Sequence, residues 1–146
     1  MRFAEAIGAE ALVPNMPEHH PATGLSIAGT PEDAKTPYVF CVNAVTEADA
    51  VIGNLNPFRG DKPDSGTVAE LTMAKMLGKI VIGHILDPRT LEEKLAVTKD
   101  ENNVCRCGGG AIVERFGLPV NLMVAHTCDE IVFGGVGREI CVLPNC

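Results

Sequence analysis

Residues 49–83 read DAVIGNLNPFRGDKPDSGTVAELTMAKMLGKIVIG, and this stretch decides the fold. The apolar run at 50–55 predicts a buried strand, and the loop that follows it is rich in Pro, Gly and Asp. A helical pattern then runs from about Gly66 to Leu77, and Gly78 ends it. The next apolar run follows at once, so we predict a strand–helix–strand unit with parallel strands and a right-handed crossover.

Acidic residues occupy the loop and the first turns of this helix. In open parallel sheets, ligands bind beyond the carboxyl ends of the strands, where the loop at 56–65 is expected. This loop contains Asp64 and the predicted helix N-cap Ser65, and Glu70 lies about one turn inside the helix. Glu70 and Lys75 are about 140° apart around the helix, at ~100° per residue, and should face different ways. A structural role for these carboxylates remains an alternative, because the helix dipole favours negative charge there.

The composition favours a globular protein, and its net negative charge is compatible with a neutral small ligand. The chain has 146 residues, 46% of them hydrophobic, and a net charge of -7 from 19 acidic and 12 basic residues. The length predicts one domain over 1–146, and the lack of an apolar run long enough to span a bilayer excludes a membrane partner. The lack of a Lys/Arg cluster argues against a nucleic-acid partner. We find no secretory leader and expect a cytoplasmic protein.

Six cysteines raise the question of a metal or a disulfide. Cys105 and Cys107 are separated by one residue, and Cys141 and Cys146 by four. Only the second pair approaches the spacing that zinc ligands usually show. We therefore predict free thiols and no metal or other cofactor.

The remaining segments follow from the same patterns. Before the main unit we expect the end of a helix at 1–10, a short strand at 11–13, a long loop at 14–33 and a helix at 34–48 with Phe40, Val42 and Val45 facing inward. After the helix at 66–77 we expect a strand at 79–86, a short helix at 90–97 opened by Thr90 and a flexible connection at 99–110. Pro119 should lie in the first turn of a helix, and a strand at 130–133 is followed by an irregular tail. Three histidines are ambiguous. His19, His20 and His84 are each interpreted as structural or solvated, with a functional role as the alternative.

Two separated blocks of sequence resemble the nucleoside 2-deoxyribosyltransferase family. The first is NLNPFRG at 54–60 with PDSGT at 63–67 and Glu70, and the second is FGLPVNLM at 116–123. The resemblance implies an α/β fold of three layers, with a flavodoxin-like or Rossmann-like parallel sheet in the order 2-1-3-4-5. The chain begins at what looks like the end of the family's first helix. The resemblance thus implies a single domain truncated at its N-terminus, with the first strand missing.

The resemblance also implies an activity and two catalytic residues. Members of this family are pentosyltransferases of nucleotide salvage, which exchange the base of a 2′-deoxyribonucleoside for a free purine or pyrimidine base. Glu70 matches the family's nucleophile, which forms a covalent deoxyribosyl intermediate with retention at C1′. Asp64 matches the carboxylate that gives a proton to the leaving base and takes one from the incoming base.

The other residues implied by the resemblance bind substrate. They are Asn54, Phe58, Arg59, Gly60, Ser65, Gly66, Asn121 and Met123. Asn121 and Met123 match a segment that the family contributes to a neighbouring subunit's site, so a homo-oligomer is expected. Phe58 either packs against the base or anchors its loop.

Two other functions fit the same residues. The first is an N-glycosidase that lets water take the sugar, acting on deoxynucleosides or their 5′-monophosphates, with Arg59 near the phosphate. The second is a nucleoside-binding protein without turnover, for which the missing strand argues. Release of free sugar would indicate the first, and binding without exchange would indicate the second.

Overall fold

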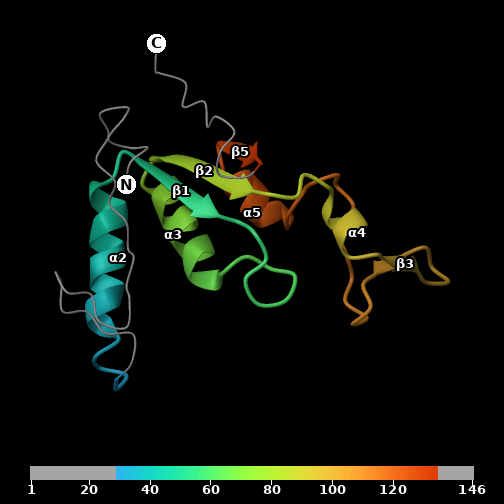
Figure 1. The fold of residues 1–146 in the computed structure, drawn as a ribbon, viewed down its shortest axis with the longest axis horizontal. Helices are drawn as coiled ribbons and strands as arrows, with labels where there is room; N and C mark the ends of the chain where they lie inside the picture. Colours follow the sequence, from blue (N-terminus) through green and yellow to red (C-terminus); the bar gives the residue numbers. More distant parts are fainter. Residues whose placement is uncertain (1–28, 135–146) are drawn as a thin grey trace, which may run out of the picture. The chain divides into compact units, whose positions relative to one another are not determined.

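The structure, a computed structural model, describes residues 29–134. The chain divides into two compact units, Met1–Asp49 and Ala50–Cys146, and we describe each by itself. Helix α2 (Lys35–Glu47) is in the first unit, and the other described elements are in the second (Figure 1). The predicted elements before residue 29, the histidine pair at 19–20 and the tail beyond 134 lie outside the described residues. The single domain therefore remains a prediction.

Helix α2 confirms the helix predicted at 34–48. Pro37 lies in its first turn, where a missing N–H removes no hydrogen bond because the first four N–H groups of a helix have no partner within it. Val45 is buried as predicted, whereas Phe40 and Val42 are half-buried. The inward face of α2 is thus confirmed in part.

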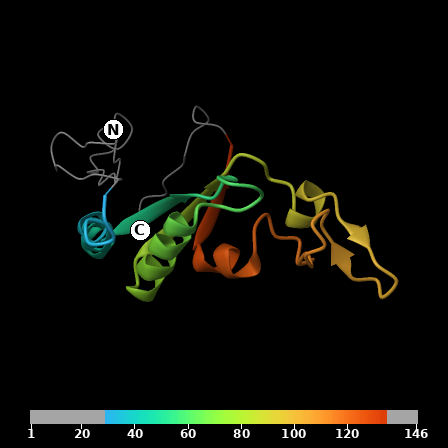
Figure 2. The ribbon, with the colours of Figure 1, turned by 90° about the horizontal axis from the view of Figure 1, so that it is seen from below.

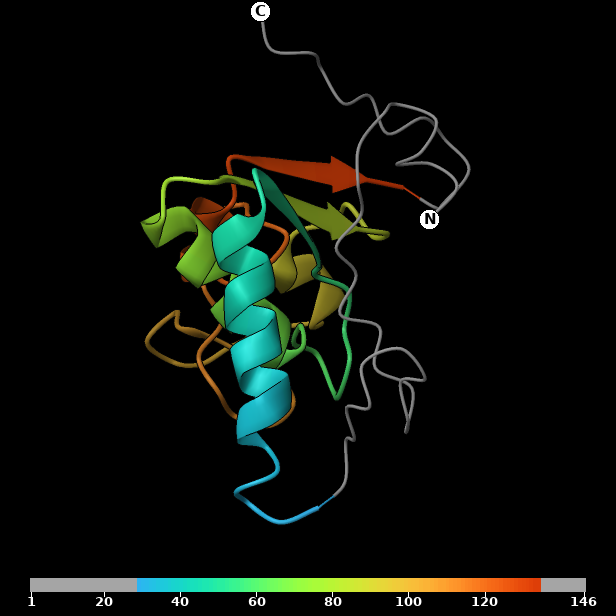
Figure 3. The same cartoon turned by 90° about the vertical axis from the view of Figure 1, so that its left-hand side faces the viewer.

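The second unit contains a three-stranded parallel sheet in the order β1-β2-β5. Its strands are β1 (Ala50–Asn54), β2 (Ile80–Ile85) and β5 (Glu130–Phe133), and the arrows of β2 and β5 point the same way in Figure 3. These strands confirm the three predicted apolar runs and the parallel strand–helix–strand unit. Their order agrees with the 3-4-5 part of the order that the resemblance implies, and the third layer remains a prediction.

Two helices cover one face of this sheet. Helix α3 (Ser65–Met76) packs against β1 and β2, and α5 (Leu122–Thr127) packs against α3 (Figure 2). The buried apolar side chains of the sheet, of these two helices and of the position directly after β1 are Leu55, Leu71, Ala74, Val81, Ile85 and Ala125. None of the helices within 29–134 is long and apolar enough to cross a membrane.

Glycines let this layer approach the strands closely. A Cβ on Gly53 would lie 2.6 Å from Cδ1 of Leu71, on α3. A Cβ on Gly83 would lie 2.5 Å from Cδ1 of Leu55 and 3.0 Å from Sγ of Cys128. Gly53 and Gly83 are register partners on adjacent strands. Because neither has a side chain, the side chains of Leu71, Leu55 and Cys128 pack directly against the strand backbone at these two positions.

The chain between β2 and α5 forms an arm that carries a second, smaller sheet (Figure 1). Helix α4 (Leu91–Lys94) is followed by the antiparallel pair β3 (Thr98–Lys99) and β4 (Cys105–Arg106). Asp100 organises this hairpin, because it accepts hydrogen bonds from the Arg106 guanidinium at 2.9 Å and from two backbone N–H groups of the turn. The segment at 99–110, predicted as a connection without regular structure, thus contains part of a hairpin, and its flexibility stays a prediction.

Candidate active site

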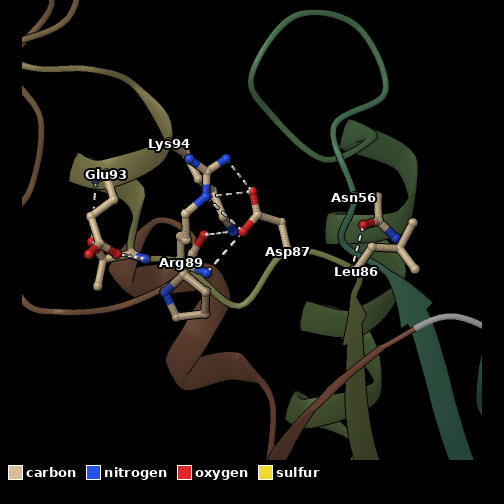
Figure 4. Close-up of polar contacts among 8 residues, drawn as sticks. Asn56, Leu86, Asp87, Arg89, Glu93 and Lys94 are labelled. Carbon is tan, nitrogen blue, oxygen red and sulfur yellow. Dashed lines mark hydrogen bonds and ion pairs between the residues drawn. The ribbon is translucent and has the colours of Figure 1, made fainter. Parts of the chain in front are cut away.

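The carboxyl ends of β1 and β2 are joined by side-chain amides. Asn54 Oδ1 accepts hydrogen bonds from the Asn56 backbone N–H at 3.1 Å and from Asn56 Nδ2 at 2.6 Å. Asn56 Oδ1 in turn accepts from the Leu86 N–H at 2.8 Å, as Figure 4 shows. The side-chain oxygen of Asn54 is thus engaged, and within 29–134 the side-chain Nδ2 group of Asn54 is the part that remains to bind a ligand. Sequence reasoning missed Asn56. The Asn-x-Asn spacing of Asn54 and Asn56 is nevertheless a signal for a turn in which an Asn side chain bonds to the backbone two residues later.

The loop after β1 closes tightly and exposes an aromatic ring. The Phe58 N–H donates to the Lys62 carbonyl at 3.0 Å, and Gly60 has a φ of +83°, which glycine adopts without strain. The Arg59 guanidinium carbon lies 5.1 Å from the centroid of the Phe58 ring, a cation–π contact. Phe58 is 60% exposed, so the ring is not a buried anchor of the loop.

Asp64 caps helix α3, and the prediction of Ser65 as the N-cap was wrong. Asp64 has an extended backbone, and its Oδ2 accepts from the Thr67 N–H at 3.0 Å. Both residue types cap helices well, so the order Asp-Ser leaves the choice to the backbone. A Cβ on Gly66 would lie 3.0 Å from Asp64 Oδ2, and glycine keeps that space open. Within 29–134, Asp64 Oδ1 has no hydrogen-bond partner.

Glu70 lies at the margin of the buried face of α3. It is half-buried and four residues before Ala74, which is fully buried and about 40° away around the helix. Within the described part of the chain, Glu70 makes no side-chain hydrogen bond or ion pair. Lys75 is exposed and pairs with Asp129, which confirms that Lys75 and Glu70 face different ways.

The geometry of α3 sets the spacing of the two predicted catalytic carboxylates. Glu70 follows Asp64 by six residues, which is roughly 9 Å along the helix axis and about 120° around it, at ~1.5 Å and ~100° per residue. Long helical side chains lean toward the helix N-terminus, a tendency that shortens the separation of the two carboxylates along the axis but not around it. Contact of one small molecule with both groups stays a prediction of the resemblance.

Asn121 caps helix α5 and is held by an acidic side chain. Its Oδ1 accepts from the Met123 N–H at 3.0 Å, and its Nδ2 donates to Glu114 Oε1. Pro119 lies before this helix and not in its first turn as predicted, because α5 begins after the Asn121 cap. Glu114 is a residue that sequence reasoning missed.

The predicted site residues fall into two groups. The first runs from Asn54 to Glu70, and the second is Asn121 with Met123, which is 70% exposed. Helix α3 follows β1 and therefore begins near the carboxyl edge of the sheet, whereas the short helix α5 leads into β5 and ends near the amino edge. Among residues 29–134, no hydrogen bond or ion pair joins the second group to either carboxylate of the first.

An ion pair follows the end of β2 near this edge. Arg89 Nη2 lies 2.7 Å from Asp87 Oδ2, and Figure 4 shows the two side chains face to face. The hydrogen bonds from Arg89 lower the pKa of Asp87 to about 2. Arg89 is thus engaged by a neighbour in its own turn. Thr90, the predicted start of the next helix, is confirmed as its N-cap and forms a capping box with Glu93.

Three of the described cysteines are free thiols, and His84 has a backbone partner. Cys105, Cys107 and Cys128 are free thiols, and burial raises the pKa of Cys128, with the charge of Asp129 adding to the shift. His84 Nε2 lies 2.6 Å from the Gly134 carbonyl oxygen, a backbone partner that supports the structural interpretation. No group of three or more metal-ligating side chains occurs within 29–134.

Comparisons with known proteins agree on one family. The family model described as nucleoside 2-deoxyribosyltransferase matches residues 1–123. Among solved structures, the chain is similar to "2-desoxiribosyltransferase from Leishmania mexicana", with 32% identity and a TM-score of 0.51. The alignment covers 66% of this chain and 57% of that one, so this chain spans less than two thirds of the other's length. The search of curated proteins gave no match.

Proposed function

The chain belongs to the nucleoside 2-deoxyribosyltransferase family, and we propose that it exchanges the base of 2′-deoxyribonucleosides for a free purine or pyrimidine base. The observation that carries the proposal is the position of Glu70. This carboxylate is half-buried on α3, the helix that begins after β1 at the edge where ligands of parallel sheets bind, and it has no partner within 29–134. An unpaired carboxylate in such a place is available to react.

In the proposed reaction Glu70 is the nucleophile. One of its oxygens bonds to C1′ of the deoxyribose as the bond from C1′ to the base breaks, and the electron pair of that bond leaves with the base. An incoming base then attacks C1′ from the opposite side and releases Glu70. Two inversions give retention at C1′, and the two half-reactions give ping-pong kinetics.

Asp64 is the proposed proton donor and acceptor. Its Oδ2 is engaged in the helix cap, whereas Oδ1 is open within 29–134. A proton on Oδ1 would pass to the departing base, and the incoming base would return one to the same oxygen. The cap thus holds the carboxyl group in place while the other oxygen carries out proton transfer.

The loop after β1 is the proposed binding surface for the nucleoside. The exposed Phe58 ring offers a face to a base, and Asn54 Nδ2 offers a donor at the strand end. Arg59 lies on the Phe58 ring and would meet a charged or polar edge of the ligand. We also assign Gly60, Ser65 and Gly66 to substrate binding: each is exposed in this loop or at the first turn of α3.

We further propose that a second copy of the chain completes each site. Asn121 and Met123 are exposed, and within 29–134 neither is bonded to Glu70 or Asp64. In a homo-oligomer both side chains would contact the substrate or nucleophile of a neighbour. Base exchange of this kind would serve nucleotide salvage in the cytoplasm.

A base-exchange assay tests this function. Purified protein is incubated with deoxyinosine or thymidine and free adenine or cytosine, and the products are separated by chromatography. We expect a new deoxynucleoside from wild type and none from Glu70→Ala. Glu101→Ala is the matched control, because Glu101 is an exposed carboxylate in the hairpin turn with no side-chain hydrogen bond within 29–134.

The same assay separates the alternatives. Release of base and free sugar without a new nucleoside would replace the transferase assignment with an N-glycosidase. Binding of deoxynucleosides without any turnover would support a nucleoside-binding protein. Incubation with the donor alone, followed by mass spectrometry of the intact protein, should show a deoxyribosyl adduct that Glu70→Ala lacks.

A further inference from the structure

Glu114 holds the residues that open helix α5. Its Oε1 accepts a hydrogen bond from the side-chain amide of Asn121, and its Oε2 accepts from the Leu122 backbone N–H at 2.8 Å. One carboxylate therefore binds both the cap residue and the first residue of the helix. No other carboxylate within 29–134 bonds to the side-chain amide of an asparagine.

These partners determine which way the Asn121 amide points. An ionised carboxylate only accepts hydrogen bonds, and a backbone N–H only donates. Since Asn121 lies between Glu114 and the Met123 N–H, its Nδ2 must face the carboxylate and its Oδ1 must face the helix. The carbonyl is thus engaged, and the second hydrogen on Nδ2 is the remaining group that can bond to another molecule.

The segment that carries Asn121 is also fastened to helix α4. The Leu91 N–H donates to the Leu118 carbonyl at 2.8 Å, and Lys94 Nζ donates to the Pro119 carbonyl at 3.0 Å. Burial lowers the pKa of Lys94. These bonds fix the backbone just before Asn121, and Glu114 then fixes its side chain.

We propose that Glu114 is a positioning residue that makes Asn121 present an N–H donor, and not its carbonyl, to an acceptor in the active site. The inference rests on the proposed function, because it assigns a role within that same site. The acceptor is an oxygen of the nucleophilic carboxylate or of the deoxyribose. An N–H donor suits an ionised carboxylate, whereas the carbonyl of a flipped amide would repel it.

Steady-state kinetics of the full chain test the inference. Glu114→Ala should lower kcat roughly 10- to 100-fold with KM changed less than about threefold, since small misplacements of reacting groups have effects of this size. Glu114→Gln should fall between Ala and wild type, because its amide keeps one acceptor oxygen but turns an NH₂ group toward a donor. Glu101→Ala, in the same arm, should retain wild-type kcat.

A double-mutant cycle with Asn121→Ala distinguishes positioning from a general structural role. If Glu114 acts through Asn121, Glu114→Ala should lower kcat by less than about twofold in the Asn121→Ala background. Multiplicative effects of the two substitutions would overturn the inference. So would a wild-type kcat in Glu114→Ala.

Hydrogen exchange of the Asn121 side-chain amide, followed by NMR, gives a readout independent of activity. We expect slow exchange in wild type and faster exchange in Glu114→Ala. Equal rates would show that the contact is absent and would overturn the inference even in an active enzyme. A wild-type protein without turnover would overturn the proposed function and the catalytic part of this inference, while the exchange rates would still test the contact.

Discussion

Replacing Gly53 by alanine should disturb both stability and catalysis. The new Cβ would lie 2.6, 2.8 and 2.9 Å from Cδ1, Cδ2 and Cγ of Leu71. Carbon atoms in contact are normally about 3.5 to 4.0 Å apart, so α3 or the Leu71 side chain would have to retreat by about 1 Å. Leu71 is only 1% exposed, so its side chain is closely surrounded. We expect a loss of about 1 to 3 kcal/mol in the free energy of unfolding.

Catalysis should fall as well, because Glu70 directly precedes Leu71 on α3. A displacement of about 1 Å at a reacting group can lower the rate by about a hundredfold. Thermal unfolding followed by circular dichroism should show a Tm lowered by roughly 3 °C for each kcal/mol. The base-exchange assay on the folded variant gives kcat. Gly108→Ala is the control, since a Cβ there meets nothing within 4 Å.

A second substitution tests the steric reason. Leu71→Ala alone should cost about 2 to 5 kcal/mol by leaving a cavity. In the double variant the methyl group added by Gly53→Ala would enter the space vacated by the leucine, so the combined loss should be smaller than the sum of the two. A wild-type Tm for Gly53→Ala, or losses that add in the double variant, would refute the reasoning.

Two further predictions concern carboxylates near the site. Asp64→Asn should keep the stability of α3, because asparagine caps as well as aspartate, but should lower kcat by about 10² to 10⁴; Asp64→Ala should lose about 1 kcal/mol in addition. Wild-type exchange in Asp64→Asn would refute the proton-transfer role. The pKa of Asp87 is lowered from 3.8 to about 2 in the folded protein. Ionised Asp87 therefore stabilises the fold above pH 3.8, and this contribution is lost as the pH falls toward 2. In the Arg89→Gln variant the carboxyl resonance of Asp87, followed by NMR, should titrate closer to pH 3.8. An unchanged titration would contradict the assignment of the lowered pKa to the Arg89 side chain.

The strands and the main helix could be predicted because they follow simple periodic patterns. The apolar run at 50–55 became β1, the run at 79–86 became β2, and the helix expected at about 66–77 became α3. These segments bury apolar side chains against one another, and burial of that kind leaves a clear signal in the sequence.

The hairpin at β3 and β4 and the exact helix starts could not be predicted in this way. The hairpin has two-residue strands and is held by the hydrogen bonds of Asp100, which leave no apolar pattern. At the start of α3 two adjacent capping residues competed, and the backbone chose Asp64. At the start of α5, Asn121 and Leu122 donate hydrogen bonds to Glu114, seven residues before Asn121.

The sequence by itself determined the family, the α/β class and the spacing of the two carboxylates, one just before the main helix and one six residues later within it. These features depend on local periodicity and on short motifs, which can be read without knowing what lies nearby. Only the tertiary structure decided that Glu70 is half-buried without a partner in the described residues, that Asn54 has its carbonyl engaged, and that Glu114 orients Asn121. Hydrogen-bond polarity depends on which groups meet in space, and chain order does not state that.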